Sequence, residues 1–351
     1  MNTSEENKFT PVADLGEFGL IDHLTKAFPM EREENVLGPG DDAAVVRYPA
    51  GTDLVVTTDM LVEGIHFDPM YAPLKHLGYK AIAVNLSDLA AMYARPTSVT
   101  VAVAMSNRYT LEAMEALYTG MRLACKRYGV DLIGGDTTTS PQGMTLSITA
   151  IGRVPEGKAV LRSGAKPNDL IVVTGDLGGA YMGLQLLERE KEVYKVNPNM
   201  QPDLAGHELV LERQLKPEPR LDILDLFDRY ELVPTSMIDI SDGLSSELLH
   251  IAKASGCGLR IYEEKLPVSD GVLNLCDEFG LHPTVPVVNG GEDYELLFTI
   301  AQADYDKIKG DPNFSIIGHI TEDPSKQLLI AKDGAEVQLE ARGWQAFNSA
   351  Q

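Results

Sequence analysis

Short runs rich in β-branched residues alternate with longer amphipathic stretches along most of the chain. Four such runs predict strands, at residues 54–58, 98–104, 146–154 and 170–174. Residues 75–92 and 111–128 carry apolar side chains at helical spacing, and the second stretch ends at Gly129, where a glycine C-cap is expected. The alternation predicts an α/β or α+β fold, in which helices pack against sheets.

The length of the chain and one loop-like segment predict two domains. A chain of 351 residues exceeds the size at which a single core usually stops growing. Residues 155–169 combine proline, glycine and charged residues before the apolar run at 170–174. We therefore expect an N-terminal domain at 1–154 and a C-terminal domain at 155–351. Ser87-Asp88 and Ser241-Asp242, each expected to open an apolar helix, give a weak indication of related halves.

The charge balance limits the ligands that the chain can take. Its 52 acidic and 30 basic residues give a formal charge of -22, which opposes binding to nucleic acid. An anionic ligand would need metal ions as bridges. The polar N-terminus and the lack of a long apolar run predict a soluble chain that does not enter a membrane. Three cysteines without a C-x-x-C pair favour free thiols in a reducing cytoplasm.

Aspartates flanked by small residues are the main chemical signal. Most of them follow apolar, strand-like runs, and strand ends gather at the sheet edge where ligands usually bind. Mg²⁺ prefers oxygen ligands and takes carboxylates together with phosphate oxygens. The motifs predict a site for more than one cation and a phosphate ligand, and they are Gly40-Asp41-Asp42, Thr57-Thr58-Asp59, Ser87-Asp88, Gly134-Gly135-Asp136, Asp239-Ile240-Ser241-Asp242 and Gly291-Glu292-Asp293.

Each motif alone has an ordinary structural explanation. Aspartate is common in turns and at helix N-caps, and the Ser87 motif could simply cap a helix. The sequence has no EF-hand loop, no P-loop and no protein-kinase motifs, so a nucleotide would have to bind by another scheme. The glycine-rich turn at 175–179 could approach phosphates, although a tight strand-to-helix turn explains it equally well.

The ordered set of motifs resembles the thiamine-monophosphate kinase family. The resemblance covers residues 38–344, and His66 and the run Gly-Gly-Glu-Asp-Tyr-Glu distinguish this family from the related aminoimidazole ribonucleotide and selenophosphate synthetases. The segments that carry it are Gly38-Pro-Gly-Asp-Asp-Ala-Ala, Thr57-Thr-Asp, Glu63-Gly-Ile-His66-Phe, Lys80 with Asn85-Leu-Ser-Asp-Leu-Ala-Ala-Met92, Leu132-Ile-Gly-Gly-Asp-Thr-Thr138, Arg162-Ser-Gly-Ala-Lys-Pro167, Ile238-Asp-Ile-Ser-Asp-Gly-Leu244 and Gly290-Gly-Glu-Asp-Tyr-Glu-Leu296.

The resemblance implies a two-domain, aminoimidazole-ribonucleotide-synthetase-like fold. The N-terminal domain would pair with its twin in a homodimer, and the C-terminal domain would close over the active site. The implied Mg²⁺ ligands are Asp42, Thr57, Thr58, Asp59, Asp88, Asp136, Asp239 and Asp242. The implied nucleotide contacts are Tyr118, Gly135, Asp136, Arg162 and Ser241, and the implied thiamine-phosphate contacts are His66, Glu292 and Trp344.

The implied reaction is direct, in-line transfer of the γ-phosphoryl group of ATP to thiamine monophosphate, with several Mg²⁺ ions. Asp42, Asp59, Asp88 and Asp239 would hold the ions that join donor and acceptor. Two alternatives stay open: another ATP-dependent enzyme of the superfamily, and a regulator that binds nucleotide and Mg²⁺ without turnover. The stretch 188–201 is not explained by the motifs.

Overall fold

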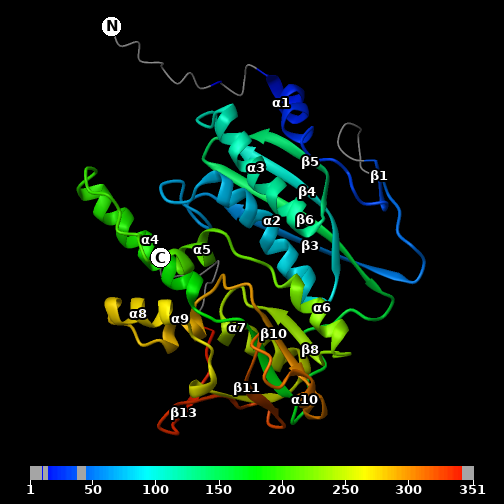
Figure 1. Cartoon of the computed structure of the whole chain (residues 1–351), viewed down its shortest axis with the longest axis vertical. Coiled ribbons are helices and arrows are strands. Elements are labelled where there is room, and N and C mark those ends of the chain that lie inside the picture. Colours follow the sequence, from blue (N-terminus) through cyan, green and yellow to red (C-terminus); the bar gives the residue numbers. More distant parts are fainter. Residues whose placement is uncertain (1–9, 11–14, 38–44, 342–351) are drawn as a thin grey trace. The chain divides into compact units, whose positions relative to one another are not determined.

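A computed structural model describes residue 10, residues 15–37 and residues 45–341 (Figure 1). The chain forms two compact units: unit 1 comprises residues 1–85 and 96–153, and unit 2 comprises residues 86–95 and 154–351. The predicted α/β (α+β) class is confirmed, because both units combine helices with a β-sheet. The predicted roles of the domains 1–154 and 155–351 stay a prediction.

Unit 1 is built on a four-stranded sheet with the strand order β3-β6-β4-β5, beside a two-stranded β1-β2 ribbon. Strands β4 and β5 are parallel. The elements that begin in unit 1 are α1 (Gly16–Thr25), β1 (Asn35–Leu37), β2 (Val45–Val46), β3 (Thr52–Val62), α2 (Leu74–Ala91), α3 (Leu111–Tyr128), β5 (Asp131–Thr139) and β6 (Met144–Pro155). Strand β4 (Arg95–Met105) begins at the last residue of the segment that belongs to unit 2.

Helices α2 and α3 approach each other closely because glycine stands at the contact on both. A Cβ at Gly78 would lie 1.9 Å from the Leu117 carbonyl oxygen, and one at Gly120 would lie 1.8 Å from the Lys75 carbonyl oxygen. Helix α3 matches its predicted range, 111–128, and Gly129 ends it in the left-handed conformation that favours glycine. Strand β6 alternates buried and half-buried residues, as expected for a sheet with one packed face.

Unit 2 contains a seven-stranded sheet with the order β13-β12-β9-β11-β7-β10-β8. Strands β9 and β12 pair in parallel, and the other pairings along this order are antiparallel. Its strands are β7 (Leu170–Thr174), β8 (Ser236–Asp239), β9 (Gly258–Tyr262), β10 (Leu296–Ile300), β11 (Phe314–Thr321), β12 (Gln327–Ile330) and β13 (Glu336–Gln338). Its helices are α4 (Gly179–Val196), α5 (Glu208–Leu215), α6 (Leu221–Arg229), α7 (Leu244–Ser255), α8 (Asp270–Phe279), α9 (Thr284–Asn289) and α10 (Tyr305–Ile308), with short 3-10 helices at Glu263–Lys265 and Gln302–Asp304.

Alternate residues of the central strands of this sheet enter two different cores. Ile171 and Val173 of β7 pack in one core with apolar residues of α7. Val172 packs in the other core with α6 and with Ala90 and Ala91 from the last turn of α2. The sheet therefore lies between two helical layers, which fixes the positions of the loops at its strand ends. Among the described helices, none is both long and apolar enough to cross a membrane.

Candidate active site

The two faces of β3 separate the predicted ligands of that strand. Thr57 and Asp59 are half-buried and alternate with exposed neighbours, so they share one face of the strand. The Asp59 backbone N–H donates to the Asn85 side-chain oxygen on α2 at 3.0 Å. The exposed Thr58 points to the opposite face, where its hydroxyl lies 3.2 Å from that of Thr149. Because successive strand residues alternate, a single ion can use the side chains of Thr57 and Asp59 together more readily than that of Thr58.

Two predicted nucleotide contacts of unit 1, Gly135 and Asp136, lie on β5, and the third, Tyr118, lies on α3. Gly135 is required by close packing, since a Cβ there would lie 1.9 Å from the Val101 carbonyl oxygen. Asp136 pairs with Ala102 in the parallel ladder and is exposed. The buried Tyr118 hydroxyl is hydrogen-bonded to Thr137, and burial raises the pKa of Tyr118 to about 12. The sheet therefore brings the tyrosine and the Gly135-Asp136 pair to the same part of β5.

His66 follows β3 in a short loop and is half-buried. Its Nδ1 atom accepts the Val62 backbone N–H at 3.0 Å. A backbone N–H can only donate, so the neutral imidazole carries its proton on Nε2. The loop thus holds His66 as an Nε2–H donor, which suits an anionic ligand.

Ser87 and Asp239 form a buried hydrogen bond within unit 2. The Ser87 hydroxyl donates to Asp239 Oδ2 at 2.7 Å, and both residues are almost fully buried. Ser87 and Asp88 lie inside α2, close to its end, so the expectation that this motif opens a helix was wrong. The helix begins at Leu74 because the apolar spacing already starts there, and no capping role is left for Ser87.

The loop before α7 holds Ser241 and Asp242. The Asp242 backbone N–H donates to Glu247 Oε1 at 2.8 Å. Burial raises the pKa of the Asp242 carboxyl, and the exposed Arg162 partly opposes that shift. Burial also raises the pKa of Glu247 to about 7. Glu247 was not among the predicted residues. The only sequence signal for it was the position of a glutamate in the first turn of an apolar helix.

Glu292 is joined to the same loop through the backbone. Its N–H donates to the Ser241 carbonyl oxygen at 2.7 Å, and a Cβ at Gly291 would lie 2.5 Å from that oxygen. The Glu292 side chain accepts a hydrogen bond from Gln214 Nε2 at 2.8 Å. The structure therefore places the predicted substrate contact Glu292 beside the predicted nucleotide contact Ser241.

Two predicted residues, Asp42 and Trp344, lie outside the described residues. In the part of the chain that is described, no group of three or more His, Cys, Asp or Glu side chains is arranged to hold a metal ion. The proposed metal set therefore stays a prediction.

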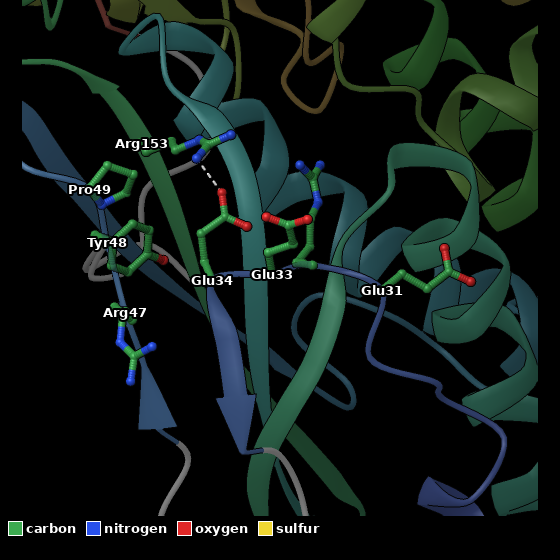
Figure 2. A pocket seen from close by; sticks show the side chains of 8 residues that line it. Glu31, Glu33, Glu34, Arg47, Tyr48, Pro49 and Arg153 are labelled. Atoms are coloured by element: carbon green, nitrogen blue, oxygen red, sulfur yellow. Dashed lines mark ion pairs between the residues drawn. The ribbon is translucent and has the colours of Figure 1, made fainter.

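A cavity of about 550 Å³ lies in unit 1 beside the β1-β2 ribbon. Figure 2 shows the side chains around it, with Glu34 ion-paired to Arg153. It is lined by Glu31, Arg32, Glu33, Glu34, Arg47, Tyr48, Pro49 and Arg153. None of the predicted site residues lines this cavity, so its size alone gives no reason to place the chemistry there.

Comparison with known proteins adds the following similarities. Residues 40–154 match the N-terminal domain of AIR synthase related proteins, and residues 166–330 match their C-terminal domain. The chain is 34% identical to thiamine-monophosphate kinase of Bacillus subtilis (strain 168), covering 95% of this chain and 100% of that protein. The crystal structure of thiamine-monophosphate kinase from Stenotrophomonas maltophilia K279a is 34% identical, with a TM-score of 0.77, over 92% of this chain and 98% of that one. A structure described as AaThiL complexed with AMPPCP and TMP is 32% identical, with a TM-score of 0.73, over 98% and 100%.

Proposed function

Because the chain belongs to the thiamine-monophosphate kinase family, we propose that it transfers the γ-phosphoryl group of ATP to thiamine monophosphate and forms thiamine diphosphate. The observation that carries this function is the match over nearly the whole of both chains to a relative described with both AMPPCP, an ATP analogue, and TMP. The chain is thus an ATP-dependent phosphotransferase with a phosphate group as acceptor.

The reaction needs positioning more than it needs a base. A phosphate monoester has a second pKa of about 6, so the acceptor is already largely ionised at neutral pH. The obstacle is the approach of two anions within a protein that itself carries a formal charge of -22. Catalysis by this chain therefore consists of orienting donor and acceptor for in-line attack and of offsetting their charge.

Mg²⁺ fits the proposed ligands, because carboxylate and hydroxyl oxygens are the donors that it prefers. When bound, it would neutralise part of the phosphate charge. Burial raises the pKa of the Asp242 carboxyl, and a nearby cation would offset that cost. We assign Asp42, Asp59, Asp88 and Asp239 to the central ions, with Thr57, Thr58, Asp136 and Asp242 as further ligands.

The remaining roles are proposed from the family resemblance, and the geometry within each unit supports some of them. Tyr118, Gly135 and Asp136 would contact the nucleotide, and the Tyr118 hydroxyl is hydrogen-bonded to Thr137, the residue after Asp136 on β5. Arg162 is exposed beside the Ser241-Asp242 loop, where a guanidinium can pair with phosphate oxygens. His66 would donate its Nε2–H to the acceptor phosphate, and Glu292 and Trp344 would contact the thiamine portion.

A homodimer is supported by the exposed face of β3. Leu54, Val56 and Met60 alternate along this edge strand, and each exposes half or more of its surface. Apolar residues gathered on one strand face favour burial against another chain. We expect light scattering to give the mass of a dimer for the wild type and of a monomer for Val56→Asp. A wild-type monomer would contradict the assignment.

The direct test is to incubate the protein with ATP, Mg²⁺ and thiamine monophosphate and to detect thiamine diphosphate by chromatography. A parallel measurement of ADP release with aminoimidazole precursors as acceptors distinguishes another enzyme of the superfamily. Single-turnover reactions with γ-labelled ATP should leave no labelled protein, since transfer is direct. If nucleotide binds and no acceptor yields product, the chain is a non-catalytic nucleotide-binding protein.

A further inference from the structure

Helix α5 places two consecutive side chains against the segment that contains Glu292. Arg213 Nη1 donates to Glu295 Oε1 at 2.6 Å, and Gln214 Nε2 donates to Glu292 Oε2 at 2.8 Å. Gln214 is 5% exposed, so this amide is withdrawn from solvent. One short helix therefore fixes both glutamates of the Glu-Asp-Tyr-Glu run.

The position of α5 is itself fixed by close packing on α4. A Cβ at Gly183 would lie 2.2 Å from the Val210 carbonyl oxygen and 3.0 Å from Cβ of Gln214. A Cβ at Gly179 would lie 3.0 Å from Cγ of Arg213. Because both glycines face α5, the two helices approach more closely than larger side chains would permit. Gln214 thus comes from a backbone that has little room to shift.

The segment that Gln214 contacts has an unfavourable backbone conformation. Glu292 and Tyr294 have φ angles of 65° and 50°, a region that residues other than glycine rarely adopt. Backbone hydrogen bonds hold the segment: Glu292 donates to Ser241 and Tyr294 donates to Ile240, at 2.7 and 2.8 Å. Such conformations persist where surrounding contacts determine them, and they occur often at functional sites.

Asp293 and Glu295 anchor the segment on either side of Tyr294. Asp293 accepts the backbone N–H groups of Gly178 and Ala180 at the start of α4, at 2.8 and 3.4 Å. Glu295 also accepts from Arg220 at 2.6 Å and from the Thr174 hydroxyl at 2.5 Å. These anchors fix the backbone, whereas Gln214 contacts the Glu292 carboxylate itself. The glutamine therefore helps to set the orientation of that carboxylate.

We propose that Gln214 is a positioning residue for the acceptor: its amide orients the Glu292 carboxylate toward the cationic thiamine portion of thiamine monophosphate. The inference rests on the proposed function and on Glu292 as an acceptor contact. A neutral amide suits this task, because it donates a hydrogen bond to the carboxylate without adding a charge of its own. The site thereby gains selectivity for a cationic phosphate ester over a neutral one.

The test measures KM for both substrates and kcat in Gln214→Leu, which removes the donor. The expected result is a rise of about tenfold in KM for thiamine monophosphate, the size of one hydrogen bond to a charged group, with KM for ATP within about twofold. Gln214→Glu places a second carboxylate against Glu292, so its KM for thiamine monophosphate should rise further and fall again as the pH is lowered.

A matched control and a double variant separate positioning from packing. Val210→Ala removes buried apolar contacts of α5 but keeps the Val210 carbonyl that packs on Gly183, so it should lower Tm and leave KM for thiamine monophosphate unchanged. Gln214→Leu combined with Glu292→Gln should give the same KM as Glu292→Gln alone, since the glutamine acts through that carboxylate.

Three results would overturn the inference: an unchanged KM in Gln214→Leu, an equal rise in Val210→Ala, or additive effects in the double variant. Each of them leaves the proposed function standing if the wild type forms thiamine diphosphate. A wild type without that activity overturns the proposed function instead, and then calorimetric titration with thiamine monophosphate still decides whether Gln214→Leu weakens binding.

Discussion

Ser87-Asp88 and Ser241-Asp242 share a dipeptide sequence and differ in structural role. Ser87 lies inside α2, where its hydroxyl holds the buried Asp239 carboxylate. Ser241 lies in a loop, where its backbone carbonyl oxygen holds Glu292. Ser87 thus acts through its side chain on Asp239, which is proposed to bind metal. Ser241 acts through its backbone on residues 292–295, the acceptor segment, which contains Glu292. A repeated dipeptide provides the same functional groups at both places, and the surrounding structure decides which of these groups forms the hydrogen bond.

The largest effect on activity is expected from a substitution of Asp239, the carboxylate that Ser87 contacts. Asp239→Asn keeps the shape and an oxygen that can accept from Ser87, and it removes the charge proposed for the central ions. Loss of one such preorganised electrostatic contact costs about 10²–10³-fold in kcat. Steady-state kinetics at saturating Mg²⁺ checks this, with circular dichroism as the folding control. Turnover near the wild-type rate would remove Asp239 from the catalytic set.

Ser87→Ala should destabilise the protein, because it leaves a buried carboxylate without its hydroxyl donor. The expected loss is about 1–3 kcal/mol of unfolding free energy, measured by chemical denaturation. Ser245→Ala is the matched control, since that buried hydroxyl donates to the neutral Asn289 at a longer 3.3 Å. If both variants lose the same stability, the Ser87 hydrogen bond has no special weight.

Asp293 allows a pH-dependent test of the segment 292–295, which is hydrogen-bonded to Ser241. Burial raises its pKa from 3.8 to about 7, so the folded state retains a proton that the unfolded state releases. The stabilisation that the protonated Asp293 gives to the folded state is therefore lost as the pH rises from about 4 to about 7. The stability difference between wild type and Asp293→Asn should shrink across that window in denaturation curves. A difference that grows with pH would show that Asp293 is ionised in the fold.

The smallest effect is expected for Ser241→Ala. Because Ser241 holds Glu292 through its carbonyl oxygen, loss of the hydroxyl should change the unfolding free energy by less than about 0.5 kcal/mol. The proposed nucleotide role predicts a modest rise in KM for ATP alone. A stability loss as large as that of Ser87→Ala would erase the contrast between the two pairs.

The sequence predicts the elements that have strong local signals. The range 170–174 is strand β7, and 111–128 is helix α3, because apolar periodicity and a glycine C-cap act over neighbouring residues. Helix α4 runs from Gly179 to Val196 and was not among the helices predicted from apolar spacing. Charged residues of the stretch 188–201 continue that helix, and a pattern based on apolar positions does not extend to them.

The site residues also divide into those with a local sequence signal and those that meet only in the fold. Aspartates beside small residues are visible in sequence, but Gln214 and Glu292 are separated by 78 positions and meet only in the fold. Glycines 179 and 183, four residues apart on one helix face, are the local sign that another helix passes there. The contact of Ser87 with Asp239 spans 152 positions and had no local sign.

Helix α4 has a fixed first turn and an exposed far end. Its first turn is held by Asp293, and its 18 residues extend about 27 Å to an end where Val196 is 88% exposed. The Glu190 carboxylate accepts the Asp203 backbone N–H at 2.9 Å and closes the base of the protruding tip. Residues 191–202 therefore form an appendage that can be shortened, extended or labelled with a fluorophore without disturbing the acceptor segment at the other end.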